Sequence, residues 1–303
     1  MKGVRLVPTA VPVVALMVDR LAGEPPPSLH PVVWVGRYLD AWTERHQPDG
    51  TPAVEVLQGA LGVGVGCVLS VAAAWAAGRV LARLPRVVRP IVEGALLSTL
   101  LSERMLTREV LATDHALHDG IDAGRRRLAG LVSRDVSALD AGEVREGALE
   151  SLAENASDSV VASLWWYAVA GLPGAAVYRF VNTADAMWGY RTPAWEWRGK
   201  VAARLDDVCN WVPARLTAML LAPGWHVGRL ACEARRTPSP NAGWPIAAVA
   251  MRWNVQLRKP GVYTLNETGR RPRSADVADV VAAVRRVSVA AAVAAALVGG
   301  RQA

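Results

Sequence analysis

Carboxylates and amides are concentrated between residues 150 and 215, in sequence that is otherwise apolar. On a helix, Glu150, Glu154 and Asp158 recur every four residues, so their carboxylates lie on one face and repel one another unless a cation lies between them. Such a row alone is typical of a solvated helix face. Here an apolar run follows directly, and ionisable groups beside apolar helices are costly enough to indicate a substrate or ion site.

Two further polar clusters follow that apolar run. Their acidic, basic and amide members are Asn182, Thr183, Asp185, Arg204, Asp206, Asp207, Asn210 and Arg215. Three clusters of this composition in one region favour a functional site over a solvated surface.

The composition is typical of a membrane protein and not of a nucleic-acid-binding one. The 303 residues are 52% hydrophobic and include 12 Trp but one Phe, and Trp favours membrane interfaces, where its ring is apolar and its N–H stays wet. The net charge of +7 comes from cations spread over loops, so we expect no nucleic-acid partner. Cys67, Cys209 and Cys232 are isolated and odd in number, which argues against a disulfide framework or structural zinc.

Hydrophobic runs predict an all-α, polytopic integral membrane protein. The clearest spanning candidates are residues 56–82 and 160–181; less certain ones are 4–18, 208–222 and 277–299. Gly171, Pro173 and Gly174 interrupt the second candidate. A broken helix in a membrane frees backbone groups to line a polar cavity, so this interruption suits a binding site.

Residues 91–154 show amphipathic helical periodicity and predict a water-facing helical layer attached to the spans. Four arginines between residues 79 and 89 follow the first spanning candidate, so the positive-inside rule places that end in the cytoplasm. We found no repeat or domain linker. The sequence therefore predicts one membrane-embedded helical domain over residues 1–303, a multi-pass protein of the cell membrane with a cytoplasm-facing layer.

Residues 19–36 contain four prolines, which predict a shaped loop that holds His30 in a fixed direction. Polar side chains fixed on loops are often functional, and a simple turn between helices is the alternative.

In order along the chain, these motifs resemble the adenosylcobinamide-phosphate synthase family of cobalamin biosynthesis. The matching segments are Gly23-Glu24-Pro25, His30-Pro31-Val32, Arg134-Asp135, the block from Glu150 to Asp158, Asn182 to Tyr190, Ala203 to Leu216, Ser239 to Pro245, and Lys259 to Tyr263. They extend from near residue 19 to residue 263 and so cover most of the chain. One departure is Ser163, where the family usually has proline.

The resemblance implies an integral membrane enzyme that joins adenosylcobyric acid, a corrinoid, to (R)-1-amino-2-propanol phosphate through an amide bond, using ATP. Amide formation needs a carboxylate oxygen made into a leaving group, most simply as an acyl phosphate. The polyphosphate then needs Mg²⁺ held by carboxylates and cationic donors to the transferring oxygens. Membrane lipid and other membrane enzymes of late cobalamin biosynthesis are the further expected partners.

On this hypothesis each polar motif has an expected role. The expected Mg²⁺ ligands are Glu154, Asp158, Asp206 and Asp207, the phosphate contacts are Arg134, Arg204 and Arg215, and the base for the amine is Asp185. The remaining expected substrate contacts are His30, Asp135, Asn155, Asn182, Thr183, Asn210 and Asn241.

Neither a Walker-type phosphate loop nor a dinucleotide fingerprint is present, so an ATP site has to be of another kind. Two alternatives from other classes stay open. Acidic clusters at the ends of membrane helices also suit a prenyltransferase that binds a diphosphate through Mg²⁺. A non-catalytic membrane sensor or scaffold of the same fold is the other.

Overall fold

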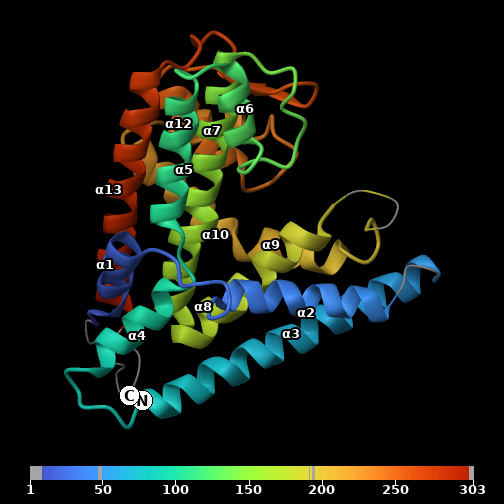
Figure 1. The fold of residues 1–303 in the computed structure, drawn as a ribbon, viewed down its shortest axis with the longest axis vertical. Helices are drawn as coiled ribbons and strands as arrows, with labels where there is room; N and C mark the ends of the chain where they lie inside the picture. The colour runs from blue at the N-terminus through green and yellow to red at the C-terminus, as the bar shows by residue number, and fades with distance from the viewer. Residues whose placement is uncertain (1–8, 47–49, 191, 193–194, 300–303) are drawn as a thin grey trace. The chain divides into compact units, whose positions relative to one another are not determined.

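The computed structural model describes residues 9–46, 50–190, 192 and 195–299, and they are mostly helical, as the sequence predicts (Figure 1). The described chain forms two compact units. Unit 1 takes residues up to 102, residues 162–209 and those from 291, and unit 2 takes 103–161 and 210–290. Because segments of the two units alternate along the sequence, neither is a contiguous domain, and the single-domain interpretation stays a prediction.

Unit 1 is built around the long helix α3. Its elements are α1 (Val11–Ala22), α2 (Pro31–Arg45), α3 (Pro52–Leu81), α4 (Arg89–Ser98), α8 (Ala162–Trp188) and α9 (Lys200–Cys209). Helix α8 packs against α2, α3 and α9, and α1 packs against α4 (Figure 1). Gly66 allows the close approach of α3 to α8, because a Cβ at this position would overlap the Phe180 ring.

Unit 2 surrounds helix α7. Its elements are α5 (Glu103–Ala116), α6 (Ile121–Leu128), α7 (Ala141–Ala156), the π-helix η1 (Ser157–Val161), α10 (Trp211–Leu221), α11 (Val227–Ala234), α12 (Gly243–Arg252), β1 (Leu257–Lys259) and β2 (Tyr263–Leu265). Helix α13 (Ser274–Val298) begins in this unit. Helices α5, α6 and α12 and strand β1 all pack against α7. The antiparallel pair β1 and β2, joined by a turn with Gly261 at φ 73°, is an addition to the predicted all-α fold.

Three helical stretches are long and apolar enough to cross a membrane: Pro52–Leu81, Ala141–Trp188 and Ser274–Val298. They match three of the five predicted spanning segments. The charged residues of the second stretch are mostly in α7, so its apolar part is α8. Helix α10 is apolar but shorter, and the candidate at 4–18 falls partly outside the described residues. Passage through a membrane stays a prediction.

The predicted interruption of the second candidate is confirmed. Helix α8 is kinked where Ala170 has φ −138° and Gly171 has φ 65°, a backbone conformation that favours glycine. Pro173 removes a backbone donor in the next turn.

The predicted loop over residues 19–36 is wrong at both ends. Helix α1 continues to Ala22, and α2 already begins at Pro31. Proline is compatible with the first position of a helix, because the N–H that it lacks would have no intrahelical partner there. The loop is therefore confined to residues 23–30, and His30 caps α2 by accepting a hydrogen bond at Nδ1 from the N–H of Val32 at 3.2 Å.

Candidate functional site

Helix α7 carries Glu143, Glu146 and Glu150, which together with the N-cap residue Asp140 form what we call the acidic face. The capping residues fix where this helix begins. The side chain of Asp140 accepts from the N–H of Glu143 at 2.9 Å, and the side chain of Glu143 accepts from the N–H of Asp140 at 2.8 Å. This reciprocal capping box satisfies two backbone donors that the first turn of a helix leaves without partners.

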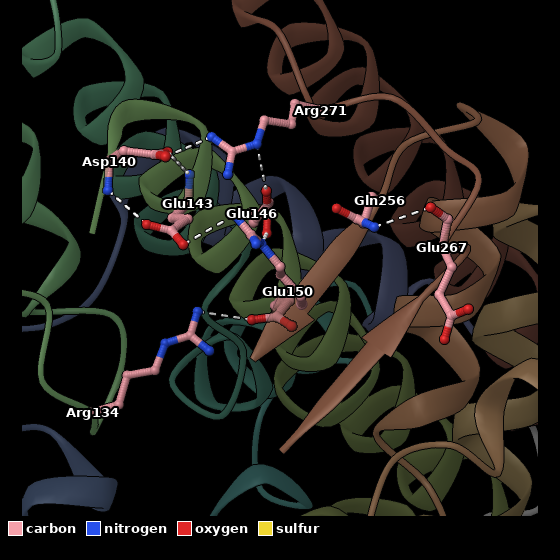
Figure 2. Close-up of polar contacts among 9 residues, drawn as sticks. Arg134, Asp140, Glu143, Glu146, Glu150, Gln256, Glu267 and Arg271 are labelled. Carbon is pink, nitrogen blue, oxygen red and sulfur yellow. Dashed lines mark hydrogen bonds and ion pairs between the residues drawn. The ribbon is translucent and has the colours of Figure 1, made fainter. Parts of the chain in front are cut away.

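Two arginines pair with the first carboxylates of the acidic face, and Figure 2 labels one of them, Arg271. Arg258 from β1 donates to Glu143 and to Glu146, at 3.0 Å in both cases. Arg271 donates to Asp140 at 2.6 Å and lies 4.0 Å from Glu146. Since Glu146 is fully buried, these arginines supply the positive charge that the carboxylate has lost from water.

Glu150, one turn further along α7, is where three of the sequence motifs meet. Arg134 donates from Nη2 to Glu150 at 2.9 Å (Figure 2). Tyr263 and Lys259, from the hairpin, also interact with the Glu150 carboxylate. The sequence indicated that Glu150, Glu154 and Asp158 repel one another unless a cation lies between them, and Arg134 supplies a cation beside Glu150. Gly147 leaves space for the Arg134 guanidinium, because a Cβ at residue 147 would lie 2.7 Å from Nη2 of Arg134.

The surroundings change the protonation of this face. Burial raises the pKa of Glu146 to about 7, although Arg258 and Arg271 act in the opposite direction. Burial likewise raises the pKa of Glu150 against the influence of Arg134. The pKa of Tyr263 is raised by burial and by the nearby Glu150, so its phenol stays protonated and able to donate. Burial thus favours the protonated form of Glu146 and Glu150, the neighbouring arginines favour their carboxylates, and the Tyr263 phenol remains a donor.

The remaining residues of the acidic block lie at the junction of α7 and η1. Glu154 and Asp158 are half-buried, and Asn155 donates to the carbonyl of Ser151 at 3.0 Å. The π-helix begins at Ser157, so the four-residue spacing from Glu154 to Asp158 extends past the end of the α-helix. π-Helical turns are uncommon and often occur at functional sites.

Arg215 is fixed in a second part of unit 2. Its guanidinium lies 4.4 Å from the Trp211 ring centroid and 4.8 Å from that of Trp244. It donates to Asn241 at 2.9 Å and to the carbonyl of Pro240 at 3.3 Å. Two predicted substrate contacts, Arg215 and Asn241, are therefore in direct contact, although they come from separate motifs.

In unit 1, the predicted residues of α8 and α9 are joined through a hydrogen-bonded chain. Asn182 donates to Asp206 at 3.2 Å and accepts from Arg179 at 3.1 Å. Asp206 is buried. Arg179 was not among the predicted residues; its signal in the sequence is that it is the one charge within the apolar run at 160–181.

The other predicted residues have less elaborate surroundings. Thr183 donates to the carbonyl of Arg179 at 2.8 Å, and Glu24 lies 3.6 Å from Nε2 of His30. Asp135 accepts from the N–H and the hydroxyl of Ser137, which lowers the pKa of its carboxyl. Asp185 and Asp207 are half-buried, Arg204 is exposed, and Asn210 is buried at the start of α10.

The predicted Mg²⁺ ligands fall in both units: Glu154 and Asp158 in unit 2, Asp206 and Asp207 in unit 1. Within the residues that the structure describes, no group of three or more His, Cys, Asp or Glu side chains is arranged to hold a metal ion. A four-carboxylate metal site stays a prediction.

Comparison with known proteins gives one consistent result. The family model described as CobD/Cbib protein matches residues 12–292. A protein of Methanothermobacter thermautotrophicus named "Probable cobalamin biosynthesis protein CobD" is 39% identical over 272 residues, which are 85% of this chain and 86% of the relative. "Cobalamin biosynthesis protein CobD" of Brucella suis is 37% identical over 295 residues, 89% of each chain. No solved structure matches significantly.

Proposed function

The chain belongs to the CobD/Cbib protein family, and from that premise we propose that it is a membrane enzyme of cobalamin biosynthesis. The reaction is the ATP-dependent joining of adenosylcobyric acid to (R)-1-amino-2-propanol phosphate, which gives adenosylcobinamide phosphate. The relatives named for cobalamin biosynthesis support the pathway, and the three long apolar helices support membrane association.

The observation that carries the proposal is the meeting of Arg134, Glu150 and Tyr263. These residues come from three separate motifs, and the cation is buried together with the acid. In the part of the chain that the structure describes, Nε of Arg134 is buried and has no hydrogen-bond acceptor. A buried donor without an acceptor is costly, so its presence supports an anionic ligand such as a phosphate.

The chemistry proceeds in two steps. An oxygen of the corrinoid carboxylate attacks the terminal phosphorus of ATP, so that ADP leaves and an acyl phosphate remains. The amine of aminopropanol phosphate then attacks the acyl carbon, inorganic phosphate leaves, and the amine proton passes to a base, for which Asp185 stays our candidate.

The chain's own residues have three tasks in this reaction. Arg134, Arg204 and Arg215 hold phosphate oxygens, since guanidinium groups match them with paired donors. Either predicted acidic pair, Glu154 with Asp158 or Asp206 with Asp207, would supply the one or two carboxylates that a Mg²⁺ ion bound to ATP requires, and the ion would neutralise phosphate charge. The amides at residues 155, 182, 210 and 241 suit the amide-fringed corrin.

The test measures formation of adenosylcobinamide phosphate by the purified protein, reconstituted in lipid and supplied with Mg²⁺. Adenosylcobyric acid, aminopropanol phosphate and ATP are supplied together and with each omitted in turn, and the amide is identified by mass. We expect product only with all components, and its loss in Asp206→Asn but not in Asp40→Asn, an exposed aspartate on α2 of the same unit. Absence of product from folded protein would overturn the ligase reaction and favour a binding or scaffold role. Turnover of an isoprenoid diphosphate instead would favour the prenyltransferase.

A further inference from the structure

Unit 1 contains an apolar cavity of about 360 Å³ that the proposed reaction does not use. On α3 it is lined at positions 66, 69, 70, 73, 74 and 77, which share one face of the helix. At 1.5 Å per residue this face extends for about 16 Å. The cavity is therefore elongated along α3, a shape that suits a linear chain better than a macrocycle.

One charged side chain lines this cavity, that of Arg179. The neighbouring Phe180 packs on Gly66 and lies 5.9 Å, between ring centroids, from Tyr38. Arg179 therefore joins the lining next to Phe180 and Gly66, whereas Ala77 lies about three turns further along α3 and Leu172 about two turns earlier on α8. An apolar slot with a cation at one end is complementary to a linear amphiphile that carries one negative charge.

The cavity opens on an apolar surface. Trp34, Leu69 and Leu96 line it and are themselves exposed. Only 22% of the most apolar stretch of α3 is buried, and its large exposed apolar side chains are valines, leucines and Trp75. If α3 spans the bilayer, as the proposed function holds, this surface faces lipid acyl chains, and a lipid reaches the cavity without passing through water.

We propose that this cavity binds one anionic phospholipid of the bilayer, with an acyl chain along the α3 face and the phosphate held by Arg179. The proposal rests on the membrane association in the proposed function. It also connects the lipid to the predicted site, because Arg179 donates to Asn182, which donates to Asp206.

Native mass spectrometry tests the proposal on the full chain. The protein is reconstituted in phosphatidylcholine vesicles with or without phosphatidylglycerol, extracted in mild detergent, and its bound lipids are counted. We expect one phosphatidylglycerol per chain. Ala74→Leu fills the cavity and is expected to lower occupancy at least tenfold, whereas Ala72→Leu, outside the lining on the same helix, leaves it unchanged. Arg179→Gln is expected to lose the preference for the anionic lipid, and Arg83→Gln to keep it.

Several outcomes would overturn the lipid site. Equal phosphatidylglycerol occupancy in folded Ala74→Leu and Ala72→Leu would do so. Wild-type protein that retains no lipid, or that retains an apolar molecule other than a lipid, would also overturn it. If Ala74→Leu does not fold, Ala77→Val gives a second, smaller filling of the same cavity. Amide formation is measured on the same samples. Product without bound lipid contradicts only the lipid site, and bound lipid without product contradicts only the ligase reaction.

Discussion

Nη2 of Arg134 lies 2.9 Å from Oε2 of Glu150, and the two side chains are 15% and 7% exposed. Arg134 belongs to the bend that precedes α7, so this contact ties the bend to the middle of the helix. Removing one member of a buried ion pair leaves the other charge without compensation, which is usually costlier than removing both.

We therefore expect Arg134→Ala to destabilise the protein by about 3 kcal/mol, and Glu150→Gln to destabilise it less because the neutral amide still accepts from Arg134. The unfolding temperature, followed by Trp fluorescence, measures both. Arg126→Ala, an exposed arginine on α6, serves as the control. Equal stability of Arg134→Ala and Arg126→Ala would mean that the pair contributes nothing.

Gly147 tests the same contact from the helix side. A Cβ at residue 147 would lie 2.7 Å from Nη2 of Arg134 and 3.2 Å from Leu128, so Gly147→Ala displaces the guanidinium. We expect a loss of about 1–3 kcal/mol, reduced by the better helix propensity of alanine. Gly228→Ala on α11, where nothing lies within 4 Å, should instead be neutral or stabilising. In an Arg134→Ala background the cost of Gly147→Ala should shrink; an undiminished cost would place the clash elsewhere.

The sequence was sufficient to predict the helical fold, the break at Gly171 and the repulsion within the row of Glu150, Glu154 and Asp158 that a cation would relieve. These features depend on local composition or on charges a few residues apart. It predicted the loop at 19–36 wrongly because proline breaks a helix interior but is compatible with its first turn, as at Pro31.

The cations of the acidic face could not be predicted. Arg258 reaches Glu146 across 112 positions of sequence, from a hairpin that has strands of only three residues. Such pairing depends on tertiary packing that no local pattern records. Glu146 continues the four-residue row one turn before Glu150, so spacing could have placed it there, but its complete burial depends on tertiary packing.

Glu146 should give the protein a pH-dependent stability near neutrality. Burial raises its pKa to about 7 in the folded protein, above the ordinary value of 4.5 that applies on unfolding. The folded state then binds the proton more tightly, so the contribution to stability is complete below pH 4.5 and is lost as the pH rises through about 7. We expect the unfolding temperature to fall between pH 5 and pH 8, and Glu146→Gln to flatten this dependence. A slope unchanged in Glu146→Gln would assign the titration to another group.

Arg215 should not be replaceable by lysine. Its planar guanidinium lies over Trp211 and Trp244 and donates to Asn241 and to the carbonyl of Pro240. A lysine ammonium lacks the flat face and cannot keep the forked donor geometry. We expect Arg215→Lys to destabilise the protein by ~1–2 kcal/mol and to lower amide formation, whereas Arg229→Lys, over the single ring of Trp225, should change neither. Full stability with lost activity would assign Arg215 to ligand binding; full stability and activity together would show that a positive charge alone suffices there.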